Sequence, residues 1–481
     1  MTVRVPGRVA SSLLLAALST GCLTTHHPRQ LVRLEAEQPA GILFHDVSVF
    51  TGTSESLVEH QDVYVRGGRI ESIGATGSAT VPAAAQVIEG SGKTLMPGLV
   101  DLHGHLTGTA SPPWALAWPD ADHTGQSYLY CGVTSVYDVA GDLDELAKVR
   151  KREAAGEWVG PRFTYSGQMV TASNGYPASM VRDLFNWPVS SVAIGHFATE
   201  VTSAVEAEKA VDLRQRLGAD HIKVGLAEIP LGSPVFTPEL LHSVVESAHR
   251  RGMKVVAHID TEAHALLAAR AGVDVLVHLV HLGPLSPAAA RELAERKVPV
   301  VLTLVAFQRM EDIKQLRYQP TEIERELNPP EMLEPYSPSV VAKADVTKGM
   351  GEWVAALISS HDQRIANVKV LLDAGVEVLA GSDGEGSAAT WAGGAYLEEL
   401  QLMAKAGVPP AQVLLGATSR AARIIQPEPD FGAIEPAKRA DLLLVQGDPL
   451  ADLDLGGRIV AVMQGGKWVE RMRPAKPLAA R

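Results

Sequence analysis

The stretch that decides the fold is Met96-Pro97-Gly98-Leu99-Val100-Asp101-Leu102-His103-Gly104-His105. An apolar run ends here in two histidines that are separated by one glycine. On an extended strand, residues i and i+2 point to the same face, so His103 and His105 can offer two imidazoles to one metal ion. Gly104 between them permits a tight backbone turn. Such a pair alone also fits two unrelated surface histidines, so its meaning depends on the rest of the chain.

Short β-branched runs alternate with helical patterns over residues 97–427. The eight runs are Leu99–His103, Val133–Val139, Arg162–Ser166, His221–Gly225, Lys254–His258, Val273–His278, Val298–Leu304 and Val376–Gly381. Amphipathic stretches such as Thr237–Arg251 lie between most of them. Eight strand–helix units predict an α/β fold with a (β/α)8 TIM-like barrel, in which the chemistry lies at the carboxyl ends of the strands.

Both ends of the chain alternate apolar and polar residues instead. Residues 41–96 and 428–472 each contain strand patterns with a Gly-Gly hairpin turn, at Gly67-Gly68 and Gly465-Gly466. We therefore predict one small β-sandwich domain formed by both ends, with residues 97–427 inserted as the barrel domain. Residues 308–351, between the seventh and eighth strands, fit either a lid over the barrel mouth or a disordered insertion.

Residues 1–22 have the pattern of a signal peptide, since a basic start is followed by an apolar segment too short to span a bilayer. Gly21-Cys22 resembles a bacterial lipobox, in which the cysteine is lipidated. Ser19 stands where an aliphatic residue is usual, so ordinary signal cleavage is the alternative. We expect an exported protein, either anchored through Cys22 on the periplasmic or outer side or soluble and secreted. Residues 23–40 would be a linker.

The composition excludes several classes of protein. The chain has 481 residues, of which 46% are hydrophobic, and Lys+Arg is 43 against 55 for Asp+Glu, a formal charge of −12. This acidic balance argues against binding to nucleic acid or to an anionic membrane surface, so we expect membrane contact only through the lipid anchor. Two cysteines exclude a disulfide framework, and Cys131 fits a buried apolar position. A homo-oligomer is left open.

Polar side chains occur at the places where the predicted strands would reach the barrel mouth. They are His103, His105, Lys223, His258, His278 and Asp383. Each alone has an ordinary explanation: a hydrogen-bonded core histidine, an ion-paired lysine or a helix-capping aspartate. Placements from five strands on one rim are hard to obtain by chance. Imidazole and carboxylate ligands suit Zn²⁺ or a related divalent ion.

The set fits a two-metal hydrolase. Two ions about 3.5–4 Å apart need a bridging anionic group. Lysine itself cannot bridge them, but a carbamate formed from Lys223 and CO₂ can. The nucleophile would be a water bridging the metals as hydroxide, because coordination lowers its pKa from 15.7 to about 7. Asp383 can bind one ion, take the proton from this water and return it to the leaving amine.

These residues resemble the amidohydrolase superfamily, in particular its imidazolonepropionase-like and metal-dependent prolidase-like branch. The resemblance covers residues 41–470. Its most specific segments are Pro97–His105, Gly132–Val139, Gly272–Asp274 leading to His278, Gly381–Asp383 and Gly432–Asp441. The chain departs from the family pattern at Val277, where Glu is frequent, and at Ala437, where Gly is common.

The resemblance implies a role for each candidate ligand. The two histidines of the opening stretch would bind the more buried of two divalent ions, with zinc as the expected metal. His258 and His278 would bind the second ion. The carbamate on Lys223 would bridge the two, and Asp383 would be both ligand and proton shuttle.

The resemblance also implies hydrolysis of an amide bond in a small molecule or short peptide. We expect a dipeptidase, a carboxypeptidase-like enzyme or an N-acyl amino acid hydrolase. The alternatives are a lactone, ester or organophosphate hydrolase with the same binuclear site, and a catalytically silent binding lipoprotein. Candidate substrate contacts are Tyr176, His196, His281 and Arg309, because a substrate carboxylate needs such donors. Each of the four also fits a structural or surface position.

Overall fold

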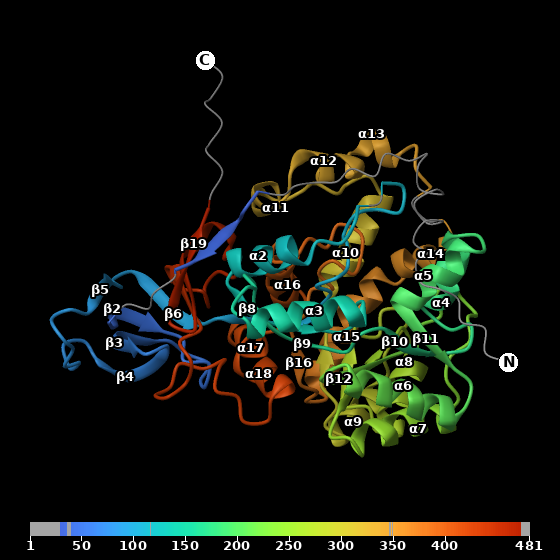
Figure 1. Cartoon of the computed structure of the whole chain (residues 1–481), viewed down its shortest axis with the longest axis horizontal. Helices are drawn as coiled ribbons and strands as arrows, with labels where there is room; N and C mark the ends of the chain where they lie inside the picture. Colours follow the sequence, from blue (N-terminus) through green and yellow to red (C-terminus); the bar gives the residue numbers. More distant parts are fainter. Residues whose placement is uncertain (1–28, 36–39, 116, 346–347, 349, 473–481) are drawn as a thin grey trace.

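The computed structural model describes residues 29–35, 40–115, 117–345, 348 and 350–472. A β-sheet body lies at one end of the molecule and a helix-covered barrel at the other (Figure 1). The predicted signal peptide, 1–22 with Cys22, lies outside the described residues. Within the described ranges, no helix is both long and apolar enough to cross a membrane.

Eight parallel strands form the barrel, and each falls on a run predicted from the sequence. They are β7 (Leu99–Gly104), β8 (Val133–Asp138), β9 (Arg162–Tyr165), β12 (His221–Gly225), β13 (Lys254–His258), β14 (Val275–Val277), β15 (Val300–Val301) and β16 (Val378–Leu379). Strands β7 to β9 pair in one sheet and β12 to β16 in another. The two sheets meet where the Leu102 amide donates to the Ala380 carbonyl (3.2 Å) and Gly104 bridges Gly384 in parallel. Strands β10 (Met169–Ala172) and β11 (Ala198–Val201) extend the second sheet beyond β12.

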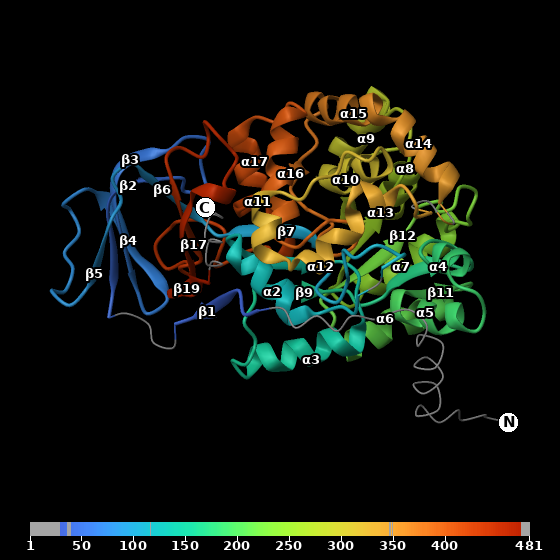
Figure 2. The same ribbon diagram turned by 90° about the horizontal axis from the view of Figure 1, so that it is seen from above.

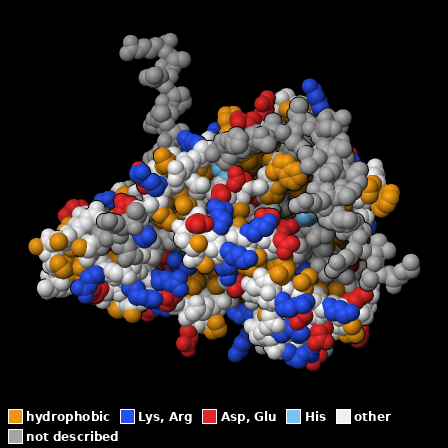
Figure 3. Space-filling model, in the orientation of Figure 1, with side chains coloured by type: hydrophobic (Ala, Val, Ile, Leu, Met, Phe, Trp, Pro, Cys, Tyr) orange, Lys and Arg blue, Asp and Glu red, His pale blue; other side chains and the backbone are white. Residues whose placement is uncertain are grey.

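The strands read as apolar runs because parallel barrel strands are buried on both faces. β8 and β12 are buried at every position. The surrounding helices include α6 (Ala204–Arg216), α7 (Pro238–His249), α8 (Glu262–Ala271) and α9 (Pro287–Glu295). A serine or threonine caps the start of each of these four, and its side chain accepts a hydrogen bond from a first-turn backbone amide. Basic and acidic side chains are interspersed over the face drawn in Figure 3.

A nine-stranded mixed sheet from both ends of the chain confirms the predicted β-domain. Its strands are β1 (Val32–Leu34), β2 (Ile42–Val49), β3 (Val58–Arg66), β4 (Arg69–Ala75), β5 (Gln86–Glu89), β6 (Lys93–Pro97), β17 (Leu442–Gln446), β18 (Ile459–Gln464) and β19 (Lys467–Arg471). The order is β1-β19-β18-β17-β6-β2-β3-β4, with β5 beside β2. Because β6 pairs with β17 and runs directly into β7, this sheet fixes where the barrel starts.

Part of the predicted linker, 23–40, is a strand. β1 pairs antiparallel with β19, with Val32 opposite Arg471. Leu31 and Val32 are fully buried, and the Leu31 amide donates to the Gln126 side chain (2.9 Å). This strand could not be predicted from the sequence, because three residues that follow a polar run are too few to show an alternating pattern.

The segment between β15 and β16 carries short helices that are joined by turns and irregular stretches over its described residues. It contains α10 (Leu304–Lys314), α11 (Glu322–Leu327), α12 (Pro330–Leu333), α13 (Pro338–Val341), α14 (Gly351–Ser359) and α15 (His361–Asp373). Helices α11 to α13 lie together along one side of the barrel (Figures 1 and 2). The Tyr336 hydroxyl donates to the Ala110 carbonyl and accepts from the Ala389 amide (2.9 Å). Since these alanines follow β7 and β16, the segment is fastened to the loops at the barrel mouth.

Candidate active site

Three side chains from the ends of β7 and β16 form the centre of the site. The Nε2 atoms of His103 and His105 lie 3.2 Å and 2.9 Å from Oδ1 of Asp383. The ligand atoms of the three residues all lie within 4.8 Å of one another. This clustering is the geometry that one cation requires of its ligands.

The hydrogen bonds of His105 decide which of its ring nitrogens faces the centre. Nδ1 donates to the Ala140 carbonyl at 2.6 Å, so Nε2 is the ring nitrogen that faces Oδ1 of Asp383 at 2.9 Å. A proton on Nε2 or a bound cation stabilises this contact between a ring nitrogen and a carboxylate oxygen. A ligand histidine that donates its other N–H to a carbonyl is the usual arrangement at a metal site.

The backbone leaves ordinary strand geometry at the ligands. Asp383 has φ 56° and His278 φ 65°, in the left-handed region that residues other than glycine rarely adopt. A Cβ atom at Gly386 would lie 2.6 Å from Oδ1 of Asp383, so the loop approaches too closely for a side chain. Such conformations persist only where the surrounding structure holds them, and they are common at functional sites.

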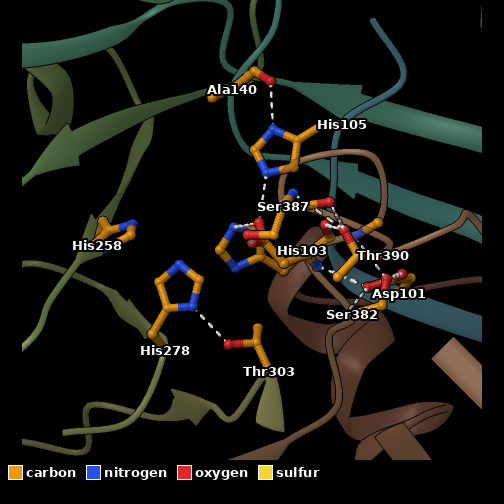
Figure 4. A network of polar contacts seen from close by, with 12 residues as sticks. Asp101, His103, His105, Ala140, His258, His278, Thr303, Ser382, Ser387 and Thr390 are labelled. Atoms are coloured by element: carbon orange, nitrogen blue, oxygen red, sulfur yellow. Dashed lines mark hydrogen bonds and ion pairs between the residues drawn. The ribbon is translucent and has the colours of Figure 1, made fainter. Parts of the chain in front are cut away.

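His258 and His278, at the ends of β13 and β14, complete the row of imidazoles. Their ring centroids lie 4.1 Å apart, and the His278 ring lies 4.5 Å from that of His103. Figure 4 shows His278 between the other two rings. Nδ1 of His278 lies 2.6 Å from the Thr303 hydroxyl, which leaves its Nε2 for another partner. The structure therefore brings all the predicted histidine ligands to one place.

Lys223 lies in the middle of β12 with no exposed surface, and its Nζ makes no hydrogen bond to any described residue. Burial lowers the pKa of Lys223 to about 7, while the charges of Asp383 and Asp138 act in the opposite direction. An unpaired buried amine costs free energy, so this position calls for a partner that the described side chains do not supply.

The protonation states suit a cation. Burial is the largest cause that lowers the pKa of His103, His258 (to about 4) and His278, with a smaller contribution from Lys223. Burial alone would raise the pKa of Asp383, but its contacts with His103 and His105 lower it well below its usual range. Burial would lower the pKa of His105, but its contact with Asp383 raises it. Neutral imidazoles and an ionised carboxylate are the forms that bind divalent metals.

Two of the four candidate substrate contacts have side chains that reach solvent. The Tyr176 ring lies 4.8 Å from that of His258, and burial together with the charges of Asp383 and Asp260 raises the pKa of its phenol. Tyr176 therefore borders the site. His196, on α5 (Val189–Phe197), pairs with Asp142 at 2.6 Å and is 60% exposed, outside the cluster of ligands.

The other two candidates take buried structural positions, the alternative that the sequence left open. His281 is fully buried, with Nε2 3.2 Å from Oδ1 of Asp260 and its ring stacked on Phe307. Arg309 forms ion pairs with Glu324 (2.9 Å) and Glu398. Neither side chain is open to a substrate.

Sequence reasoning missed the polar residues that lie beside the ligands. Asp260 has Oδ1 3.6 Å from Nε2 of His258, too far for a hydrogen bond, and the Ser387 hydroxyl donates to Oδ2 of Asp383 at 2.5 Å. Asp101 is fully buried beneath His103. The only signal for them in the sequence was spacing, since Asp101 stands two residues before His103 and Asp260 stands two residues after His258.

The chain is similar to known proteins both in sequence and in fold. The sequence matches the Amidohydrolase family over residues 94–469. Ochratoxinase of Aspergillus niger is 26% identical over 407 residues, which cover 78% of this chain and 75% of that protein. Imidazolonepropionase of Geobacillus sp. strain WCH70 is 22% identical over 413 residues, covering 81% and 84%. A crystal structure of a Xaa-Pro dipeptidase with bound methionine shares the fold, with a TM-score of 0.71 and 23% identity over 89% of this chain and all of that chain.

Proposed function

This chain belongs to the amidohydrolase family, and we propose that it hydrolyses the amide bond of a dipeptide or an N-acyl amino acid. It is a metal-dependent hydrolase that acts on carbon–nitrogen bonds. The observation that carries the proposal is the convergence of His103 Nε2, His105 Nε2 and Asp383 Oδ1, three possible ligand atoms within 4.8 Å of one another. Two imidazole nitrogens and a carboxylate oxygen at this spacing fit one divalent cation.

Asp383 is suited to move the proton during hydrolysis. When bound, a divalent cation lowers the pKa of water and polarises the scissile carbonyl. Oδ1 of Asp383 faces the two histidines, while Ser387 holds its Oδ2, so the carboxylate has one orientation. Ionised Asp383 can accept the proton of the attacking water and deliver it to the leaving nitrogen, which departs as a neutral amine.

We also propose that Lys223 carries a carbamate. The neutral amine attacks CO₂, forms a carbon–nitrogen bond and releases one proton, which gives a carboxylate-like anion. The burial of Lys223, its unpaired Nζ and its pKa of about 7 support this proposal, because much of the amine is uncharged at neutral pH. The anion could bridge two cations, with His258 and His278 as ligands of the second and zinc as the expected metal.

The relatives support a peptide-like substrate. One solved neighbour is a Xaa-Pro dipeptidase, and the ochratoxinase relative is named for a different small molecule. Tyr176, whose ring lies beside that of His258, is the candidate to contact the substrate next to the scissile bond. We further propose export of the protein, on the signal-peptide pattern of residues 1–22.

A substrate panel tests this function. The protein purified with Zn²⁺, Mn²⁺ or Co²⁺ would be given dipeptides that include Xaa-Pro, N-acyl amino acids, a lactone, an ester and a phosphotriester. We expect turnover of a dipeptide or an N-acyl amino acid, and loss of that turnover in Asp383→Asn. Turnover of only the lactone, ester or phosphotriester would overturn the amide proposal. A native protein without bound metal would overturn the metal site itself.

A further inference from the structure

Asp101, in the stretch that decides the fold, has no role in the proposed chemistry, yet it is fully buried between the two ligand-bearing strands. Its Oδ1 accepts the backbone amides of His103 (2.9 Å) and Ser382 (3.0 Å). Its Oδ2 accepts the Ser382 hydroxyl at 2.5 Å. The Asp101 carboxylate therefore forms hydrogen bonds with His103, which is the first ligand on β7, and with Ser382, which directly precedes Asp383.

Regular strand pairing is short at these two strand ends. The register between β7 and β8 shifts between Asp101 and Gly104, and β16 is only two residues long. Beyond β16, the chain turns through the left-handed conformation of Asp383. Backbone hydrogen bonds join the two strand ends from Leu102 to Ala380 (3.2 Å) and from His105 to Gly384 (2.9 Å), and Asp101 supplies the link between these two points.

The surroundings show that the two strand ends are held very close together. A Cβ atom at Gly104 would lie 2.5 Å from the Tyr128 hydroxyl oxygen, and one at Gly384 would also clash with it. The Ser382 hydroxyl oxygen in turn accepts the Gly384 amide at 3.0 Å. All of these contacts are buried, so a change in one is not compensated by water.

We propose that Asp101 is a positioning residue that sets the separation of the His103–His105 pair from Asp383 and so determines the affinity of the site for its cation. The inference rests on the metal site proposed above. Both oxygens of Asp101 are bonded to His103 and Ser382, so it would act on the cation through these two residues. Loss of a partner that orients a ligand typically weakens metal binding 10- to 100-fold.

The test measures metal affinity in full-length variants by competition between the protein and a chromophoric chelator for Zn²⁺. Asp101→Ala should raise the Kd for Zn²⁺ by about 10- to 100-fold. Asp101→Asn should stay within about threefold of the wild type, because its carbonyl oxygen still accepts both amides and its amide can donate to the Ser382 oxygen. Ser382→Ala removes one of the three contacts and should raise the Kd by about three- to tenfold, as a partial loss of the same partner.

Asp62 of β3 provides the matched control. It is also buried, with 2% exposed, and accepts three hydrogen bonds, from the Asp46 and Gly77 amides and the His45 ring. Asp62→Ala should lower the thermal midpoint by an amount similar to Asp101→Ala and leave the Kd for Zn²⁺ unchanged. A Co²⁺-loaded Asp101→Ala protein should also show an altered d–d absorption spectrum, which general destabilisation does not produce.

The outcomes separate this inference from the proposed function. A wild type that binds no Zn²⁺ means that the metal site has failed. A wild type that binds Zn²⁺ while Asp101→Ala binds equally well, or while Asp62→Ala weakens binding as much, overturns the positioning role. If Asp101→Ala does not fold, Ser382→Ala decides: an unchanged Kd overturns the inference and a raised Kd supports it.

Discussion

Replacing Lys223 with methionine should make the metal-free protein more stable and inactive. Lys223 is fully buried, and its Nζ has no hydrogen-bond partner among the described residues. Methionine fills a similar volume with an apolar side chain that needs no partner. The lysine is kept at a cost in stability, and we expect this cost to appear whenever the carbamate and cations are absent.

The size of the effect follows from the pKa of Lys223, which burial lowers from 10.5 to about 7 in the folded protein. The folded state therefore binds fewer protons than the unfolded state between these values, and the penalty is full below pH 7 and gone above pH 10.5. One pKa unit corresponds to about 1.4 kcal/mol. Linkage then gives a penalty of about 4 kcal/mol at pH 7.5 and about 1.5 kcal/mol at pH 9.5.

The assay is urea unfolding with a metal chelator in CO₂-free buffer, followed by circular dichroism at both pH values. Lys223→Met should have the larger free energy of unfolding, and its advantage over the wild type should shrink by roughly 2.5 kcal/mol from pH 7.5 to pH 9.5. Lys209→Met, at an exposed position on α6, is the control and should change neither value. A destabilised Lys223→Met, or an advantage that does not depend on pH, would refute the reasoning. Adding Zn²⁺ with bicarbonate should stabilise the wild type more than Lys223→Met, which keeps His103, His105 and Asp383 but cannot form the carbamate.

Further predictions concern the residues around the cation and the free thiol. Asp383→Asn removes the proton acceptor, so kcat should fall by about 10²–10⁴-fold in steady-state kinetics, and a kcat near that of the wild type would rule out its role as shuttle. Ser387→Ala frees one oxygen of Asp383 and should lower kcat about tenfold at constant KM, with partial recovery in Ser387→Thr. Chelation should lower the thermal midpoint seen by calorimetry, since a cation at 100 times its Kd contributes about 2.7 kcal/mol, and an unchanged midpoint contradicts a bound metal. Burial raises the pKa of the Cys131 thiol to about 12, so in a Cys22→Ser protein it should react with a disulfide reagent at pH 8 only after unfolding.

The barrel and its ligands could be predicted because both follow from the direction of a strand. A buried parallel strand must be apolar along its length, so a polar residue at its carboxyl end stands out. Lys254–His258 shows this pattern, and the structure places it as β13 with its histidine at the mouth. Lys223 lies in the middle of its strand and was predictable for another reason, because a lysine stands there between the apolar residues Ile222 and Val224.

The exact geometry of the ligands could not be predicted because it depends on unusual backbone conformations. His278, Thr303 and Asp383 all have positive φ, at 65°, 53° and 56°. Glycine would have signalled such positions, but these residues do not. The short strand β1 was missed for a different reason, since its pairing with β19 joins residues more than 400 positions apart.

The metal ligands were easier to predict than the substrate contacts, because the ligands follow from local strand patterns and the substrate contacts depend on long-range packing. His281 stands three residues after a ligand, but its surroundings come from Phe307 of α10 and Trp353 of α14, which stack on or meet its ring edge-on. Helices of this segment are also fastened to the mouth through Tyr336 and the Ala110 carbonyl. Long-range packing of this segment thus buries a polar side chain that its position three residues after a ligand would place at the site. Alternation and spacing along the sequence do not describe such packing, which is why the substrate contacts could not be predicted.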